Sequence, residues 1–211
     1  MDGILSHLEE LLEVKNIFER KRKKYKTKAL SILLYHFGLS LRKTSLIVTS
    51  FEDISYEAIR KWYHRSKHLF YVESKHRNVI AIDETKVKIN GKLYILWAAI
   101  DIENWEILGV WITKGRASIE AYSFIKHVLK KCNNIPKILV DGGPWYRPAL
   151  QRLGLDYEHV TFGLRNPIEQ WFGFFKHRIK RFNRNWPNNA DINVVQDWID
   201  AFISIYHVMG C

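Results

Sequence analysis

"VIAIDETKVKINGKLYILWAAID", residues 79–101, is the stretch that decides the fold of this 211-residue chain. Its first part, residues 79–83, is apolar and ends on Asp83, and such a run predicts a strand that stops at the acid. Asn90-Gly91 is the pair that two-residue hairpin turns prefer. The apolar run of residues 92–101 follows it. The stretch therefore predicts an antiparallel hairpin.

The pattern continues beyond this hairpin with alternating strands and helices. Residues 107–113 predict a third strand, and residues 118–131 an amphipathic helix. The remaining expected elements are a strand at 137–140, a helix at 145–153, a strand at 156–161, a long helix from Asn166 and a helix at 194–208. A three-strand meander followed by such alternation predicts a mixed β-sheet flanked by helices. This order is that of the RNase H-like α/β fold.

A second acid closes the expected fourth strand, in "ILVDGGPWY", residues 138–146. A carboxylate is costly to bury unless something pairs with it, although Asp also caps turns well. In the RNase H-like order the first and fourth strands are neighbours. Asp83 and Asp141 would then meet although they are 58 positions apart, and Gly142-Gly143-Pro144 would turn the chain away from them.

The long helix after Asn166 supplies a third acid. Its apolar stripe has helical spacing and consists of Ile168, Phe172, Phe175, Ile179 and Phe182. Glu169 lies at the edge of the stripe, with Gly173, Lys176 and Lys180 on its side, and the glycine would let a phosphate backbone approach. Glu169 also stands three residues after Asn166, where a capping acid is common. Three acids in this order of strands and helix favour a functional role.

Three other polar groups have simpler interpretations. Asp101 also ends an apolar strand and is a reserve ligand, but a turn role is favoured. Glu84 follows Asp83 directly and should point to the opposite face of the strand. His64 and His68 have a spacing that can bind zinc, but no matching pair completes the four ligands of a structural site.

The charge of the chain indicates a polyanionic partner. Its formal net charge is +11 and its pI is about 9.6, values typical of nucleic-acid binding. Residues 1–77 hold 16 Lys and Arg against 9 Asp and Glu, most densely at residues 20–24. The longest apolar run, residues 93–100, is far shorter than the ~20 residues of a membrane span. With no signal-peptide layout and two cysteines, a cytoplasmic, nucleoid-associated protein is expected.

The first third has the pattern of a helix-turn-helix domain. Helices are expected at residues 28–37, 41–49 and 56–69, after an amphipathic helix at 5–18, with Ser40 and Ser55 as N-caps. Ile59 and Trp62 have core spacing on the last of these helices. The candidate DNA-binding residues there are Arg60, Lys61, His64, Arg65 and Lys67. We therefore expect a DNA-binding region at 1–75 and a catalytic domain at 76–211.

Three segments resemble the DDE transposases of prokaryotic insertion sequences. They are "AIDETKVKINGKLYILWAAID", "VDGGPWY" and "RNPIEQWFGFFKHRIKRF". The group of short, replicative elements common in archaea is the most similar, and the likeness runs from about Lys28 to the end. It implies that Asp83, Asp141 and Glu169 are the catalytic and metal-binding acids. The 27 residues between Asp141 and Glu169 are fewer than in better-known members, which implies a shorter loop.

The resemblance and the chemistry of the acids imply the reaction. Crowded carboxylates repel one another unless cations neutralise them, and hard oxygen ligands favour Mg²⁺ or Mn²⁺. Two ions could clamp an in-line phosphoryl displacement, first by water and then by the freed 3′-hydroxyl. The expected partners are double-stranded DNA, as terminal inverted repeats and as target, and further subunits of a homodimer or higher oligomer. The residues expected to hold phosphates are Lys176, Arg178, Lys180 and Arg181.

Two other functions remain open at this stage. A structure-specific nuclease on the same fold would keep the acids but join no ends. A helix-turn-helix regulator, or a decayed transposase, would bind DNA without chemistry. Short inverted repeats on both sides of the gene would favour the transposase.

Overall fold

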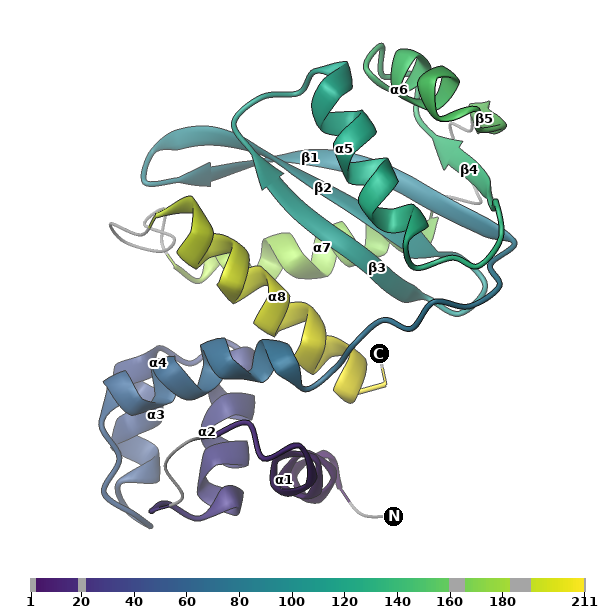
Figure 1. Cartoon of the computed structure of the whole chain (residues 1–211). Helices are drawn as coiled ribbons and strands as arrows, with labels where there is room; N and C mark the ends of the chain where they lie inside the picture. Colours follow the sequence, from purple (N-terminus) through teal and green to yellow (C-terminus); the bar gives the residue numbers. More distant parts are fainter. Residues whose placement is uncertain (1–2, 19–21, 160–165, 183–190, 211) are drawn as a thin grey trace. The chain divides into compact units, whose positions relative to one another are not determined.

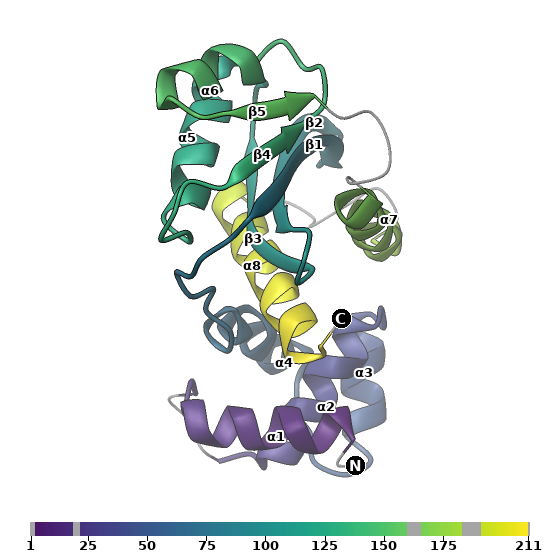
Figure 2. The ribbon, with the colours of Figure 1, turned by 90° about the vertical axis from the view of Figure 1, so that its right-hand side faces the viewer.

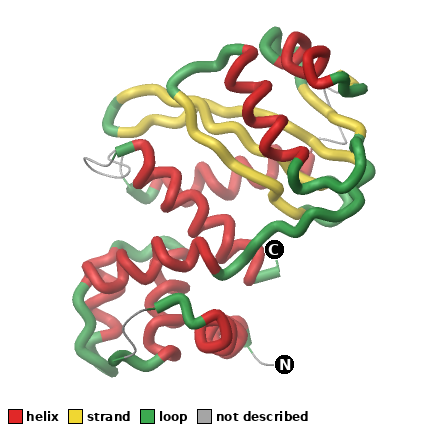
Figure 3. Tube along the Cα trace, viewed as in Figure 1, coloured by secondary structure: helices red, strands yellow, loops and turns green. Residues whose placement is uncertain are grey.

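The computed structural model describes residues 3–18, 22–159, 166–182 and 191–210. Its contacts form two compact units: Val72–Gln196, which holds the sheet, and Met1–Tyr71 together with Asp197–Cys211, which is helical (Figures 1 and 3). Arg20 and Lys21 of the basic run lie outside the described residues. Within the described ranges, no helix combines the length and apolarity needed to cross a membrane.

The sheet of Val72–Gln196 has the expected RNase H-like order, β3-β2-β1-β4-β5. The strands are β1 (Val79–Ile89), β2 (Lys92–Asp101), β3 (Glu106–Thr113), β4 (Lys137–Val140) and β5 (Tyr157–His159). The first three pair antiparallel, whereas β4 pairs parallel to β1 and β5 parallel to β4. Asn90 and Gly91 both have positive φ, 49° and 79°. These values confirm the hairpin turn.

Helices cover both faces of this sheet. Helices α5 (Ser118–Leu129) and α6 (Tyr146–Leu153) lie on one face and α7 (Asn166–Lys180) on the other (Figure 2). Ile80 and Ile82 of β1 belong to the core beneath α5 and α6. Because side chains alternate along a strand, Asp83 points to the face that carries α7.

The expectation that the first strand ends at Asp83 is wrong. Strand β1 continues to Ile89 and stays paired with β2 throughout. Its parallel pairing with β4, however, stops at Ala81↔Leu139. Asp83 therefore lies two residues beyond the point where β1 loses its β4 neighbour. The fifth strand ends at His159, and the expected residues 160–161 lie outside the described ranges.

The helical unit has the expected succession of short helices. They are α1 (Ile4–Lys15), α2 (Tyr25–His36), α3 (Leu41–Val48), α4 (Tyr56–Arg65) and a 3₁₀ turn, η1 (Ser66–His68). The Ser40 and Ser55 hydroxyls accept hydrogen bonds from the backbone N–H groups of Lys43 and Ala58, both at 3.2 Å. Both predicted N-caps are confirmed.

The aromatic anchor of α4 differs from the one expected. Ile59 is fully buried as predicted, but its buried partner is Tyr63 rather than Trp62. Tyr63 packs edge-on against Tyr35 of α2, with 4.6 Å between ring centroids. Trp62 is half-buried instead, and the centroid of its ring lies 5.9 Å from the ammonium of Lys28. Positions three and four beyond Ile59 both suit a core contact, so spacing alone did not separate them.

Helix α8 (Ile192–Val208) contributes to both units. Its Gln196 side chain hydrogen-bonds the backbone of β3, accepting from Ile112 N–H and donating to the Val110 carbonyl. From Asp197 onward it packs with the helical unit, where the Trp198 Nε1–H donates to the Tyr35 hydroxyl at 3.1 Å. The assignment of DNA binding to residues 1–75 and catalysis to residues 76–211 remains a prediction. The structure adds that the helical unit also includes Asp197–Cys211.

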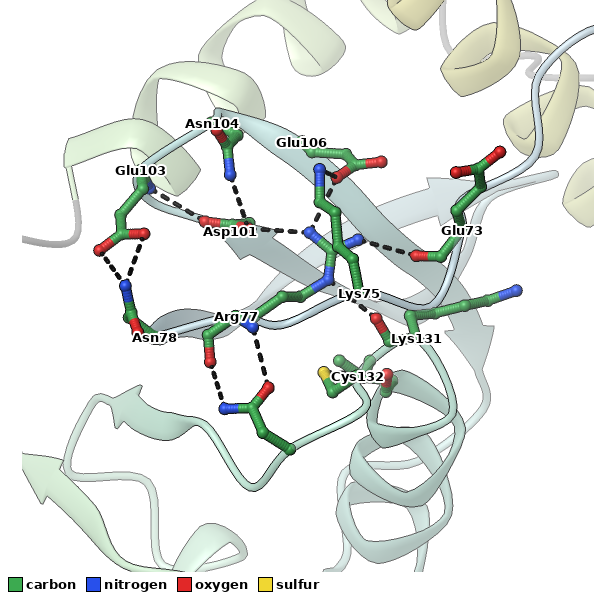
Figure 4. Close-up of polar contacts among 12 residues, drawn as sticks. Glu73, Lys75, Arg77, Asn78, Asp101, Glu103, Asn104, Glu106, Lys131 and Cys132 are labelled. Atoms are coloured by element: carbon green, nitrogen blue, oxygen red, sulfur yellow. Dashed lines mark hydrogen bonds and ion pairs between the residues drawn. The ribbon is translucent and has the colours of Figure 1, made fainter.

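A buried ionic network fastens the segment before β1 to the sheet (Figure 4). The Arg77 guanidinium is buried and pairs with Asp101 and Glu106, both at 2.8 Å. Asp101 also accepts hydrogen bonds from the Glu103 backbone N–H and the Asn104 side chain. This arrangement confirms the turn role favoured for Asp101. Burial by itself raises the pKa of Asp101, but the donors from Asn104 and Arg77 outweigh it, so the pKa lies below its usual value.

The Asp101→Asn variant should lower the free energy of unfolding by about 3 kcal/mol at pH 7, because it leaves a buried guanidinium without one partner. The depressed folded-state pKa means that the carboxylate stabilises the fold fully above the unfolded value of about 3.9. Its contribution is lost as the pH falls through the lower folded value. The difference between wild type and variant should therefore shrink between pH 7 and pH 3, as measured by urea unfolding.

The control for this prediction is Glu103→Gln, which changes an exposed acid on the same turn. It should alter stability by no more than about 0.5 kcal/mol. A loss in Asp101→Asn that is no larger than in the control would contradict the role given to the network.

Candidate active site

Two of the three predicted acids meet at one end of the sheet. Asp83 lies within β1, and Asp141 directly follows β4, the parallel neighbour of β1. One carboxylate oxygen of each lies within 4.8 Å of the other and of an oxygen of Glu84. Val140 belongs to the core beneath α5 and α6, so alternation turns Asp141, like Asp83, towards the α7 face.

The turn after Asp141 depends on its two glycines. The Gly143 N–H donates to the Asp141 Oδ1 at 2.9 Å, so one oxygen caps the turn. A Cβ added to Gly142 would lie 2.8 Å from the His159 ring, and one added to Gly143 would lie 2.5 Å from the Trp145 ring. Both distances are shorter than real Cβ contacts, so a side chain at either position would require the His159 or the Trp145 ring to move. Asp141 therefore serves the turn with one oxygen while its carboxylate stays beside Asp83.

Glu84 is the neighbour that the sequence did not assign to this group. Its side chain is only 4% exposed and is held by three residues from two segments. The Tyr146 hydroxyl and the Trp145 Nε1–H donate to Oε2, and Arg116 donates to Oε1 at 3.3 Å. Tyr146 belongs to the α5/α6 core, in keeping with the expected face for Glu84, yet the carboxylate still reaches the aspartates.

The environment of Tyr146 keeps this hydroxyl a donor. Burial, and then the negative charge of Glu84, raise the pKa of Tyr146 well above its usual value. The phenol stays protonated at neutral pH and can stabilise the Glu84 carboxylate. Sequence patterns predicted a helix around Tyr146 but gave no signal for its partner, which is 62 positions away.

Helix α7 carries the third predicted acid. The buried side of α7 includes Ile168, Phe172 and Phe175 as expected, and also Trp171. Glu169 is exposed in the first turn, on the helix that covers the face of Asp83 and Asp141. Among the described residues, it is not part of the group of oxygens within 4.8 Å. Its role as the third ligand stays a prediction.

The basic residues of α7 do not all face solvent. Lys180 and Arg181 are exposed and Lys176 is half-buried. Arg178, expected to hold a phosphate, is only 5% exposed and lies over the Phe182 ring at 4.6 Å. That expectation is wrong, because the guanidinium packs against the aromatic ring instead of facing solvent.

The candidate DNA-binding residues of α4 and η1 differ in how far they are engaged. Arg60 forms hydrogen bonds with Glu57, and Lys67 pairs with Asp197 at 2.7 Å. Arg65 reaches the Ile17 carbonyl at 3.4 Å. Lys61 is exposed. Burial, and then the charge of Arg60, lower the pKa of His64.

The Asp83–Glu84–Asp141 group fits a divalent cation in its chemistry. Three carboxylates with oxygens this close repel one another, and hard oxygen donors of this kind suit Mg²⁺ or Mn²⁺. In the part of the chain that the structure describes, this is the one such group of His, Cys, Asp and Glu. His64 and His68 belong to no such group there.

Comparisons with known proteins agree with this geometry. The DDE domain family DDE_Tnp_IS240 matches residues 77–205. The chain is 47% identical over 201 residues to the uncharacterized protein MJ0017 of Methanocaldococcus jannaschii, covering 95% of this chain and 94% of the relative. It is 28% identical to the transposase for insertion sequence element IS257 in transposon Tn4003 of Staphylococcus aureus, covering 81% and 78%.

Solved structures of lower similarity include a simian T-cell lymphotropic virus intasome in complex with PP2A regulatory subunit B56 gamma. The TM-score is 0.46 at 18% identity, covering 80% of this chain and 67% of the other. The HTLV-2 integrase catalytic core domain in complex with magnesium gives 0.43 at 16% identity, covering 65% and 85%. Because the DDE domain family matches most of the length of this chain, the chain belongs to the DDE transposases, which are metal-dependent enzymes of DNA phosphoryl transfer.

Proposed function

We propose that this insertion-sequence transposase binds the terminal inverted repeats of its element, cleaves a strand there and joins the freed end to target DNA. The observation that carries the proposal is the meeting of the Asp83 and Asp141 carboxylates where β4 ends beside β1. Glu169, on the helix over the same face, completes the proposed set of catalytic and metal-binding acids.

The chain's own groups have separate roles in this reaction. Asp83, Asp141 and Glu169 would hold Mg²⁺ or Mn²⁺, as two ions, which supply a Lewis acid and an activated attacking oxygen. The Gly142–Gly143 turn keeps Asp141 in place, and Tyr146 and Trp145 orient the Glu84 carboxylate through hydrogen bonds. The attacking groups are water in the first step and the 3′-hydroxyl in the second, so no covalent bond to the protein is needed.

The basic residues would have two roles: one set would recognise the ends of the element, and the other would bind backbone phosphates. Arg60, Lys61, His64, Arg65 and Lys67 would select the element's ends, and Lys176, Lys180 and Arg181 would hold backbone phosphates near the acids. Base-edge contacts give sequence preference, whereas phosphate contacts give affinity that falls with salt. Because an element has two ends, we propose a homodimer or higher oligomer on DNA.

The Asp141→Asn variant should lose strand cleavage in Mg²⁺ and keep DNA binding. The amide oxygen can still accept from Gly143 N–H, so the turn survives, but the neutral side chain binds a hard cation weakly. A fall of at least about a hundredfold in cleavage rate is expected. The control is Asp156→Asn, which changes an exposed aspartate of the same unit. If Asp141→Asn cleaved DNA as fast as this control, the catalytic role of Asp141 would be refuted.

Lys61→Ala and Lys180→Ala should have different effects on DNA binding. The first should reduce the preference for terminal-repeat over scrambled DNA by roughly tenfold, as expected for a lost base contact. The second should weaken binding to both DNAs alike and lower the salt slope by about one. Competition binding at two salt concentrations measures both quantities, and the opposite pattern would place end recognition in the catalytic unit.

Gly173→Ala should change stability and binding in opposite directions. Gly173 is an exposed position within α7 with nothing within 4 Å of an added Cβ, so alanine should stabilise the helix by about 1 kcal/mol. If a phosphate backbone approaches this surface, the methyl group should weaken DNA binding. Thermal unfolding and a binding titration of the same sample test the pair, and unchanged affinity would show that DNA passes elsewhere.

A further inference from the structure

Arg116 lies in the loop between β3 and α5, at the edge of the acidic group. Its guanidinium carbon is 4.0 Å from the centroid of the Trp145 ring, and its Nη1 is 3.3 Å from the Glu84 Oε1. The side chain is nevertheless 36% exposed. The guanidinium thus has neighbours on two sides, while about a third of the Arg116 side chain stays exposed.

One carboxylate separates Arg116 from the proposed catalytic acids. The Glu84 carboxylate that Arg116 contacts is the same one whose oxygen lies within 4.8 Å of oxygens of Asp83 and Asp141. Trp145, which supports the guanidinium plane, follows the Asp141 turn and donates its own Nε1–H to Glu84. Arg116 therefore contacts the acidic group through Glu84.

Neutralising Glu84 does not account for the whole arrangement. Glu84 already accepts hydrogen bonds from Tyr146 and Trp145, and its contact with Arg116 is a long one at 3.3 Å. A guanidinium has five N–H donors, and among the described residues Glu84 is its one hydrogen-bond partner. The remaining donors form a planar fork that suits two oxygens of a phosphate.

We propose that Arg116 binds a backbone phosphate of the DNA strand under attack, next to the phosphate held at the acids. Glu84 fixes one edge of the guanidinium and the Trp145 ring supports its face, so that the other edge meets the DNA with little loss of freedom. The proposal rests on the proposed function, because it takes the acidic group as the place where DNA is processed.

The test compares Arg116→Ala and Arg116→Lys with Lys114→Ala, which removes an exposed positive charge from the same loop. The probe is a fluorescein-labelled terminal-repeat duplex with a free 3′-hydroxyl, titrated with the full chain in Ca²⁺ so that binding is measured apart from cleavage. Arg116→Ala should bind about tenfold more weakly, with a salt slope reduced by about one. Arg116→Lys should fall between, since it keeps the charge but loses the fork.

Duplexes that each carry one uncharged methylphosphonate locate the contact. At one particular position, the methylphosphonate should weaken DNA binding by wild type and by Lys114→Ala. The same methylphosphonate should not weaken binding by Arg116→Ala any further, because the modified phosphate and the substituted arginine remove the same interaction. If wild type and Arg116→Ala are equally sensitive at every position, the phosphate contact is refuted and Arg116 only supports Glu84.

Two further measurements keep the outcomes distinct. Thermal unfolding by circular dichroism checks each variant, and if Arg116→Ala does not fold, the methylphosphonate comparison with Arg116→Lys decides the question. Cleavage by wild type in Mg²⁺ tests the proposed function separately. A wild type that shows the Arg116-dependent phosphate position but never cleaves would refute the transposition chemistry and leave the phosphate contact standing.

Discussion

The parallel pairing of β1 with β4 is the constraint on which the site depends. It places residues 58 positions apart in the sequence at adjacent positions, and its register, Val79↔Lys137 to Ala81↔Leu139, sets how far each strand projects. Beyond that register β4 ends and β1 continues, which leaves room for Asp141 beside Asp83. A shift of one residue would turn Asp83 into the α5/α6 core, where Ile80 and Ile82 now pack.

Charge is balanced differently at two places along β1. Just before its start, Arg77 and Asp101 form a pair that is closed to solvent, and Glu106, which is 13% exposed, is the second partner of Arg77. In its middle, Glu84 is satisfied by two neutral donors and one guanidinium that stays partly in water. A closed ion pair serves stability, because breaking it leaves a buried charge. An open one retains donors for another molecule.

Local patterns in the sequence predicted much of the fold. The Asn90-Gly91 turn, the serine caps and the apolar runs gave the strands and helices, and their order gave the sheet. The patterns did not reveal the extension of β1 past Asp83, because Lys86 and Lys88 interrupt the apolar run while Val87 and Ile89 remain buried. For the site, Asp83 and Asp141 were predictable from strand order. Glu84, Arg116 and Trp145 were not, since their contacts span 32 and 61 positions. The burial of Arg178 depends on aromatic packing that spacing does not encode.

Helix α8 makes the folding of the helical unit depend on residues that follow the whole sheet in the sequence. Trp198, Phe202 and Ser204 are core residues of that unit, yet a ribosome adds them after every residue of the sheet. Chains grow from the N-terminus at a finite rate, and domains fold as their residues emerge. Residues of α2 and α4 that pack on α8, among them Tyr35, His36 and Tyr63, thus wait for α8 before they are covered. A product that stops early would lack this cover and expose apolar surface of the kind that aggregates or is degraded, so the order of synthesis itself disfavours the survival of incomplete enzyme.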